Sequence, residues 1–164
     1  MNVLQLIKKR RSVRKFKNKT VSKGMIDKIL EAARWAPSGL NNQPWKFMVL
    51  EKRKKGLLAN YTHYSRVIKS ADKLILVFMD KKSSYNYEKD LMAIGACIQN
   101  MLIFIHSAGL GACWLGEILN QRNQVQKALK TSQNLELEAV LALGYPVLEP
   151  RKSKRRSLKN LIIK

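Results

Sequence analysis

The chain has 164 residues, a hydrophobic fraction of 46% and a formal net charge of +21. This length fits one domain spanning residues 1–164, and the hydrophobic fraction excludes a wholly disordered chain. The charge fits a solvated, lysine-rich surface, but it also fits attraction to a phosphate-bearing ligand, an acidic electron-donor protein or nucleic acid.

The first half of the chain predicts two helices and two strands. A helix is expected from about Asn2 to Lys9. A second helix should begin after an N-cap at Ser22, repeat apolar residues at helical spacing and stop before Pro37. Lys46–Glu51 and Leu74–Met79 are apolar runs of strand length, with a polar and possibly helical stretch between them.

The second half is dominated by a long apolar segment. Asp90–Ala108 predicts a helix that is apolar nearly all round, so we expect it at the centre of the domain or across a subunit interface. Its polar residues argue against a membrane span, and His106 is interpreted as a hydrogen-bonded core residue. Gly109 suits a left-handed C-cap. A strand, a helix and a strand then follow over Ala112–Trp114, Gln121–Lys130 and Glu136–Leu143.

Helices and strands mix without strict β-α-β alternation, which favours an α+β layer arrangement. The chain ends with a basic tail, Arg151–Lys159, and an apolar triplet, Leu161–Ile163. Because a chain end frays unless it is docked, we expect this triplet to pack on its own domain or on a partner.

The remaining features point to a soluble, cytoplasmic protein. No signal peptide opens the sequence, and Cys97 and Cys113 are interpreted as buried, inert thiols. The only histidines, His63 and His106, are too far apart for a recognisable metal site. We therefore expect no bound metal and no membrane association.

Three segments could carry chemistry, although each has a structural explanation too. Arg10–Arg14 (R-R-S-V-R) offers guanidiniums and a hydroxyl suited to phosphate, or is a solvated helix end. Ala36–Trp45 concentrates amide donors between two prolines and could be a ligand loop or an ordinary connection. Gly109–Glu117 has glycines that would admit a flat ligand, or it is a helix C-cap and a turn. With no acid–base or nucleophile set, an enzyme of this kind would need a cofactor.

Together the three segments resemble the FMN-dependent nitroreductase family. The resemblance rests on the order R-R-S-V-R, A-P-S-G-L-N-N-Q-P-W, a long apolar helix, G-L-G-A-C-W-L-G and L-G-Y-P, followed by a basic tail. It implies a three-layer α+β fold, with a central mixed or antiparallel sheet flanked by helices, in an intertwined homodimer with FMN at the interface.

The resemblance also implies roles for individual residues. Those that would grip the FMN phosphate and ribityl chain are Arg10, Arg11, Ser12, Arg14 and, within a residue or two, Arg155. Those of the loop that would reach the flavin from the other subunit are Pro37, Ser38, Gly39 and Asn41. Leu115 and Gly116 would face the isoalloxazine ring, and Arg66 would be the cation near its N1. No catalytic side chain is assigned.

The implied reaction is ping-pong hydride transfer from NADH or NADPH through FMN to a small acceptor, such as a nitroaromatic or a quinone. Alternatives on the same flavin fold are dehalogenation, flavin fragmentation and ferredoxin-linked reduction, the last with an acidic electron-donor protein. A nucleic-acid-binding module is a weaker alternative. The sequence has many basic residues but no series of aromatic residues for stacking on bases, no helix-turn-helix pattern and no zinc-ligand spacing.

Overall fold

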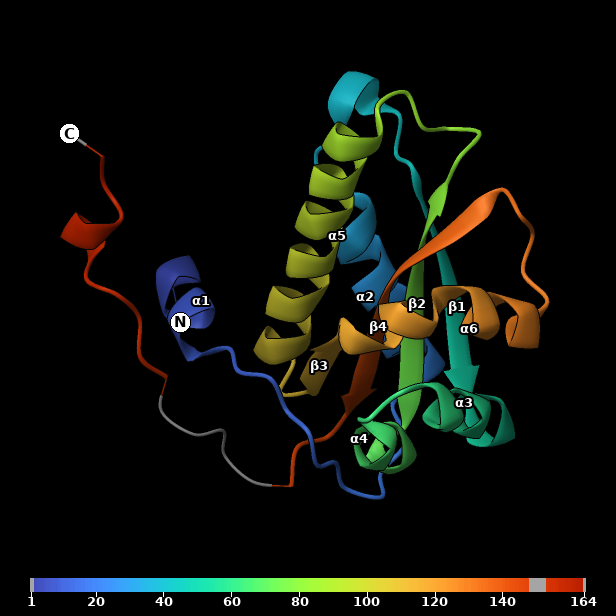
Figure 1. Cartoon of the computed structure of the whole chain (residues 1–164). Coiled ribbons are helices and arrows are strands. Elements are labelled where there is room, and N and C mark those ends of the chain that lie inside the picture. Colours follow the sequence, from blue (N-terminus) through green and yellow to red (C-terminus); the bar gives the residue numbers. More distant parts are fainter. Residues whose placement is uncertain (1, 148–152, 164) are drawn as a thin grey trace.

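A computed structural model describes residues 2–147 and 153–163 of the chain (Figure 1). Arg151 and Lys152, at the start of the predicted basic tail, lie outside the described residues. The described strands form one antiparallel sheet in the order β1-β2-β4-β3. They are β1 (Trp45–Glu51), β2 (Lys73–Asp80), β3 (Gly111–Leu115) and β4 (Leu135–Gly144).

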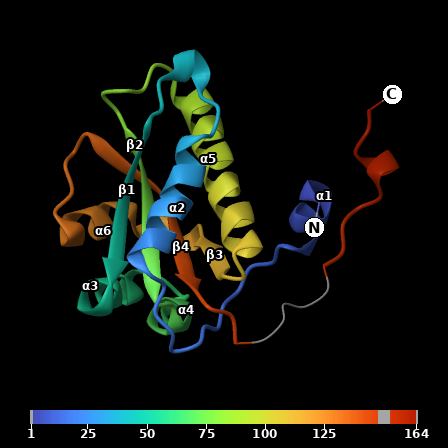
Figure 2. The ribbon, with the colours of Figure 1, turned by 180° about the vertical axis from the view of Figure 1, so that it is seen from behind.

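Helices cover both faces of this sheet, so the predicted three-layer α+β fold is confirmed (Figures 1 and 2). One face packs against α2 (Lys23–Arg34) and α5 (Tyr87–Ser107). The other packs against α3 (Lys52–Leu58), α4 (Ser65–Ser70) and α6 (Arg122–Leu129). The short 3₁₀ turns are η1 (Gly39–Asn41), η2 (Ala59–Tyr61), η3 (Glu117–Gln121) and η4 (Leu158–Asn160).

The predicted helix signals act as expected. The Ser22 hydroxyl accepts a hydrogen bond from the Met25 amide at 3.2 Å and caps α2. After α5, Gly109 has a φ of +73°, and the amide of Leu110 donates to the Ile105 carbonyl at 3.0 Å. The left-handed Gly109 and the Leu110 hydrogen bond fix where α5 ends and where the chain turns into β3.

The long helix α5 is a core helix despite its composition. Contrary to the expectation from its polar residues, it is long and apolar enough to cross a membrane by length and composition. Its buried side chains, however, pack against α2, β2 and β3. The other side of α5 is partly exposed, and Met92 is 70% exposed.

Both ends of the described chain leave the body of the molecule. The helix α1 (Val3–Lys9) contacts α5 but buries none of its residues. The tail runs out on the same side, away from the sheet (Figures 1 and 2). In the triplet, Leu161 and Ile162 are each 60% exposed and Ile163 is 97% exposed. The triplet therefore does not pack on its own domain, which leaves the partner as its predicted site.

Candidate functional site

The Arg10–Arg14 segment runs along the outer edge of β3. The Val13 amide donates to the Ala112 carbonyl at 2.9 Å, and Ser12 forms a parallel bridge with Ala112. Val13 is buried against the sheet, while Ser12 and Arg14 are exposed. Side chains alternate along an extended chain, so the predicted polar residues on either side of Val13 point away from the core.

The tail brings a further cation to this segment. Arg10 is half-buried, and its pKa is lowered by burial and then by the positive charges of Arg155 and Arg11. The Arg11 guanidinium donates to the carbonyls of Lys8 and Arg10, at 2.5 and 2.8 Å. The structure thus brings Arg155, from the other end of the sequence, to Arg10 and Arg11. Like charges held together in this way stabilise a bound anion.

A cavity of about 320 Å³ lies between this segment and the end of α5, and it is lined by Arg10, Arg11, Leu102, His106 and Pro146, among others. The prediction that His106 is a hydrogen-bonded core residue is wrong. Its Nε2 is buried but has no hydrogen-bond partner in the part of the chain that the structure describes. Burial first, and then Arg10, Arg11 and Lys9, lower its pKa. The reason is its place in the last turn of α5, facing the cations that follow α1.

At the far end of β3, Leu115 and Gly116 form an open edge. Leu115 pairs with Val140 and is buried, whereas Gly116 is exposed and a Cβ on it would meet nothing within 4 Å. The parallel bridge between Ser12 and Ala112 carries Arg14 along β3 in the same direction. This edge therefore leaves the Gly116 backbone open to a flat ligand.

Glu117 ties this edge to the loop before α4. Its carboxylate accepts hydrogen bonds from the Thr62 hydroxyl at 2.5 Å and from the His63 amide at 3.2 Å. Arg66 follows within one turn of α4 and is exposed. A cavity of about 400 Å³ opens here, lined by Asn60, Tyr61, Thr62, His63, Glu117 and Gln121. The predicted cation Arg66 thus lies near the predicted ring-facing turn.

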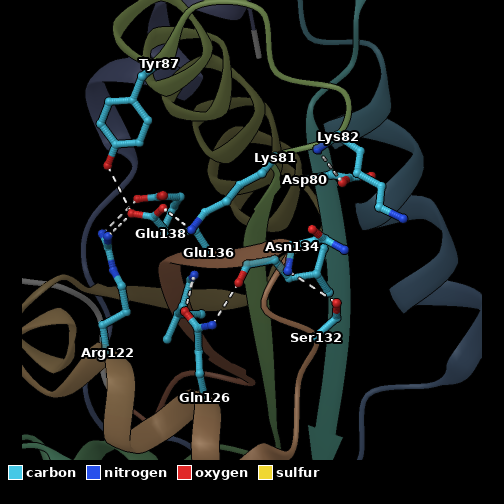
Figure 3. A network of polar contacts seen from close by, with 12 residues as sticks. Asp80, Lys81, Lys82, Tyr87, Arg122, Gln126, Ser132, Asn134, Glu136 and Glu138 are labelled. Atoms are coloured by element: carbon cyan, nitrogen blue, oxygen red, sulfur yellow. Dashed lines mark hydrogen bonds and ion pairs between the residues drawn. The ribbon is translucent and has the colours of Figure 1, made fainter.

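A polar network joins the start of α6 to β4 and to the first residue of α5 (Figure 3). Arg122, at the start of α6, pairs with Glu136 and, at 3.0 Å, with Glu138 on β4. Tyr87 donates to Glu136 at 3.1 Å. Glu138 lies where the β2–β4 register shifts, and burial raises its pKa to about 7 although the charge of Arg122 lowers it. The network fixes η3 and α6 against the sheet.

The Pro37–Asn41 loop lies elsewhere, over the N-terminal end of α5 (Figure 1). Leu40 and Asn41 adopt left-handed backbone with φ of 53° and 52°, a strained state for leucine that persists only where the surroundings impose it. The Ser38 hydroxyl accepts from the Gln43 amide at 3.0 Å. A Cβ on Gly39 would lie 1.9 Å from the Tyr85 hydroxyl, so this glycine admits Tyr85.

Two residues that anchor this loop were not predicted from the sequence. Asn42 donates to Asp90 at 2.7 Å and to the Ser83 carbonyl at 3.0 Å. Asp90 is fully buried in the first turn of α5 and also accepts from the Ser84 hydroxyl at 2.7 Å. An acidic residue opening an otherwise apolar helix, after a run of polar residues, was the available signal.

Within one chain the predicted residues fall into two groups. Those from the N-terminal segment, β3, α4 and the tail gather around β3, whereas the Pro37–Asn41 loop lies near the other end of α5. With 21 residues, α5 is about 31 Å long. A small ligand bound along β3 would therefore not reach the loop of the same chain.

Comparisons with known proteins cover nearly the whole chain. The nitroreductase family matches residues 7–66 and 54–145. A "Putative NADH dehydrogenase/NAD(P)H nitroreductase" of Archaeoglobus fulgidus is 34% identical over 87% of this chain and 84% of its own length. An iodotyrosine deiodinase of Thermotoga neapolitana is 30% identical over 86% of this chain and 87% of its own. A "putative nitroreductase in complex with fmn" from Desulfovibrio desulfuricans is 42% identical, with a TM-score of 0.96 over 100% of this chain and 96% of that one.

Proposed function

The chain belongs to the nitroreductase family, and we propose that it is an FMN-dependent oxidoreductase that uses NADH or NADPH to reduce small acceptors such as nitroaromatics or quinones. The observation that carries this function is the convergence of Arg10, Arg11 and Arg155 beside an open strand edge. Such a site suits a ligand with a phosphate at one end and a flat ring at the other.

The phosphate end fits the residues present. Arg10 and Arg155 make no ion pair within the described residues, so a phosphate dianion would relieve their mutual repulsion. Ser12 adds an exposed hydroxyl on the same strip. The buried, unpartnered Nε2 of His106 faces the same group of cations. These residues would hold the phosphate and the ribityl chain.

The ring end fits the edge of β3. The open backbone of Leu115 and Gly116 would lie against the isoalloxazine, with Arg66 as the cation near its N1. When bound, FMN supplies the hydride-transfer chemistry that the side chains of this site lack. The protein's part is to hold the ring, to place positive charge beside it and to shape access for the acceptor.

We infer that the working unit is a homodimer. The two groups of predicted residues lie at opposite ends of α5, so a complete site needs Pro37, Ser38, Gly39 and Asn41 from a second copy. The exposed apolar triplet at the chain end, together with Val3, Leu4 and Ile7 on α1, would be covered in that assembly.

The second candidate activity is reductive dehalogenation, favoured by the identity to the iodotyrosine deiodinase over most of both chains. It uses the same FMN site and differs only in the acceptor. Comparing a nitroaromatic, a quinone and an iodophenol as acceptors, with NADH and with NADPH, separates the two activities.

Titration with FMN and with riboflavin tests the site itself. The R10Q/R155Q variant should bind FMN at least tenfold more weakly, because each charge-assisted contact to phosphate contributes about 1.5–3 kcal/mol. Riboflavin lacks the phosphate, so its affinity should not change. The K28Q/K127Q variant, which removes two exposed charges elsewhere, is the control. A purified protein that is colourless and takes up no FMN would refute the proposed function.

A further inference from the structure

Basic side chains gather around the α3–α4 pair and the loop that passes it. A cleft of about 300 Å³ is lined by Lys17, Lys19, Lys55 and Lys69, from three separate segments. Arg53 and Lys54 are exposed in the first turn of α3, next to this cleft. We call these residues the basic face: Lys17, Lys19, Arg53, Lys54, Lys55 and Lys69.

The charge of the basic face exceeds what the protein neutralises from within. Glu51 pairs with Lys73, and Asp72, the carboxylate that lines the cleft, attracts Lys55 and accepts from the Val21 amide at 2.8 Å. Within the described residues, no ion pair involves Lys17, Arg53, Lys54 or Lys69. Lys55 is turned inward and donates to the Lys69 carbonyl at 3.2 Å, and the Lys19 ammonium lies 4.2 Å from the centroid of the Tyr145 ring. The face therefore presents a concentrated positive potential to solvent.

This face continues to the ring end of the FMN site. Lys69 lies three residues after Arg66 on α4, so the two side chains share one side of that helix. The loop before α4 is hydrogen-bonded through Thr62 and His63 to Glu117, which follows Gly116. A protein seated on the basic face would thus lie beside the exposed edge of a bound flavin.

We propose that the basic face docks an acidic one-electron carrier protein, which delivers electrons to the enzyme as a second donor beside NADH or NADPH. The inference rests on the proposed FMN function. Two reduced carriers would each give up one electron and leave oxidised, and two protons would come from water. The acceptor would gain the two electrons and two protons. Lysine-rich faces of this kind attract an acidic protein at long range and speed its association.

Nucleic acid is the other polyanion that such a face could bind. The observations favour a protein carrier because the charge borders the redox edge of the molecule. Electron delivery needs that proximity, and binding to a duplex gains nothing from it. Duplex binding would also need contacts that track a phosphate backbone.

The experiment compares two variants of the full chain that each remove three exposed charges. R53Q/K54Q/K69Q removes charge from the basic face, and K28Q/K82Q/K127Q removes it elsewhere. None of these residues belongs to the proposed FMN site. The probe is a reduced acidic ferredoxin, with binding measured by fluorescence anisotropy at low and high salt and turnover measured with quinone. FMN content and NADPH-driven turnover are measured in parallel.

The face variant should bind ferredoxin at least tenfold more weakly at low salt and should lose most of the salt dependence. Its FMN content and NADPH-driven turnover should match those of the parent, and the control variant should bind as the parent does. Equal binding by the two variants would overturn the proposal, as would ferredoxin binding without electron transfer. If the parent binds duplex DNA but no ferredoxin, and the face variant loses the DNA binding, the face would be assigned to nucleic acid instead. Absence of FMN would refute the proposed function separately, because anisotropy reads docking without it.

Discussion

His106 lies in the last turn of α5, where it faces the cations that follow α1. The charges of Lys9, Arg10 and Arg11 and its own burial all disfavour its protonated form. The native protein therefore keeps this imidazole neutral at a pH where the unfolded chain would protonate it. Its buried Nε2 has no hydrogen-bond partner among the described residues.

We predict that H106Q reduces the loss of stability on acidification. Because the pKa of His106 is lowered in the native state, the unfolded chain binds the extra proton, and stability falls as pH drops below about 6.5. Glutamine cannot titrate, so the urea unfolding free energy of H106Q, without FMN and at fixed protein concentration, should depend less on pH between about 7.5 and 5.5.

Glu138 changes the unfolding free energy with pH in the opposite direction to His106. The informative quantity is therefore the difference in unfolding free energy between H106Q and the parent at each pH. Burial raises the pKa of this carboxyl to about 7, so its contribution to stability is lost as pH rises through that value. This contribution is present in both proteins and cancels. H63Q, at a histidine whose side chain is 93% exposed, is the control. A parental pH slope in H106Q would show that His106 is not the titrating group.

At the scale of elements, Asp90 joins three parts of the chain. Burial alone would raise its pKa, but hydrogen bonds from Ser84, Asn42 and the amides of Asn86 and Tyr85 hold the pKa below its ordinary value. The carboxylate therefore stays charged inside the protein. It fixes the N-terminal end of α5 to the loop that carries Pro37–Asn41.

We predict that D90N destabilises the protein by about 2–4 kcal/mol, because an amide cannot accept all of these bonds and leaves buried donors unpaired. The urea midpoint should fall, and FMN should be lost more readily since the loop is no longer held. D27N, at an exposed position on α2, should change stability by less than about 0.5 kcal/mol. A stability equal to that of D27N would contradict the anchoring role.

The elements themselves followed from local chemistry. The cap at Ser22, the glycine at Gly109 and the apolar runs of β2 and β4 each depend on neighbouring residues, and each was predicted. The strand order β1-β2-β4-β3 and the bulge at Glu138 depend on pairing between distant segments, which periodicity does not encode. The same limit explains Asp90 and His106: Asn42, which donates to Asp90, and Arg10, whose charge acts on His106, lie far from them in the sequence.

At the scale of the whole molecule, the proposed FMN site draws on two copies of the chain. The resemblance to the family predicted which residues would act, and the structure separates them along α5. The apolar ends of the chain are exposed on the side where the tail brings Arg155 to Arg10. A second copy that covered these ends could also offer its own Pro37–Asn41 loop, so dimerisation and FMN binding should be coupled.

We predict that the L161S/I162S/I163S variant becomes monomeric and loses FMN together. Each of these side chains would contribute about 1.5–3 kcal/mol when buried against a partner, so dimer affinity should fall by at least 100-fold. Stability of the monomer should not decrease, because these side chains are exposed within one chain. K159Q, in the same tail, is the control. Sedimentation and FMN titration at one protein concentration check both effects. A dimer that persists would show that the triplet is not part of the dimer contact. A monomer that keeps parental FMN affinity would show that one chain forms the site alone.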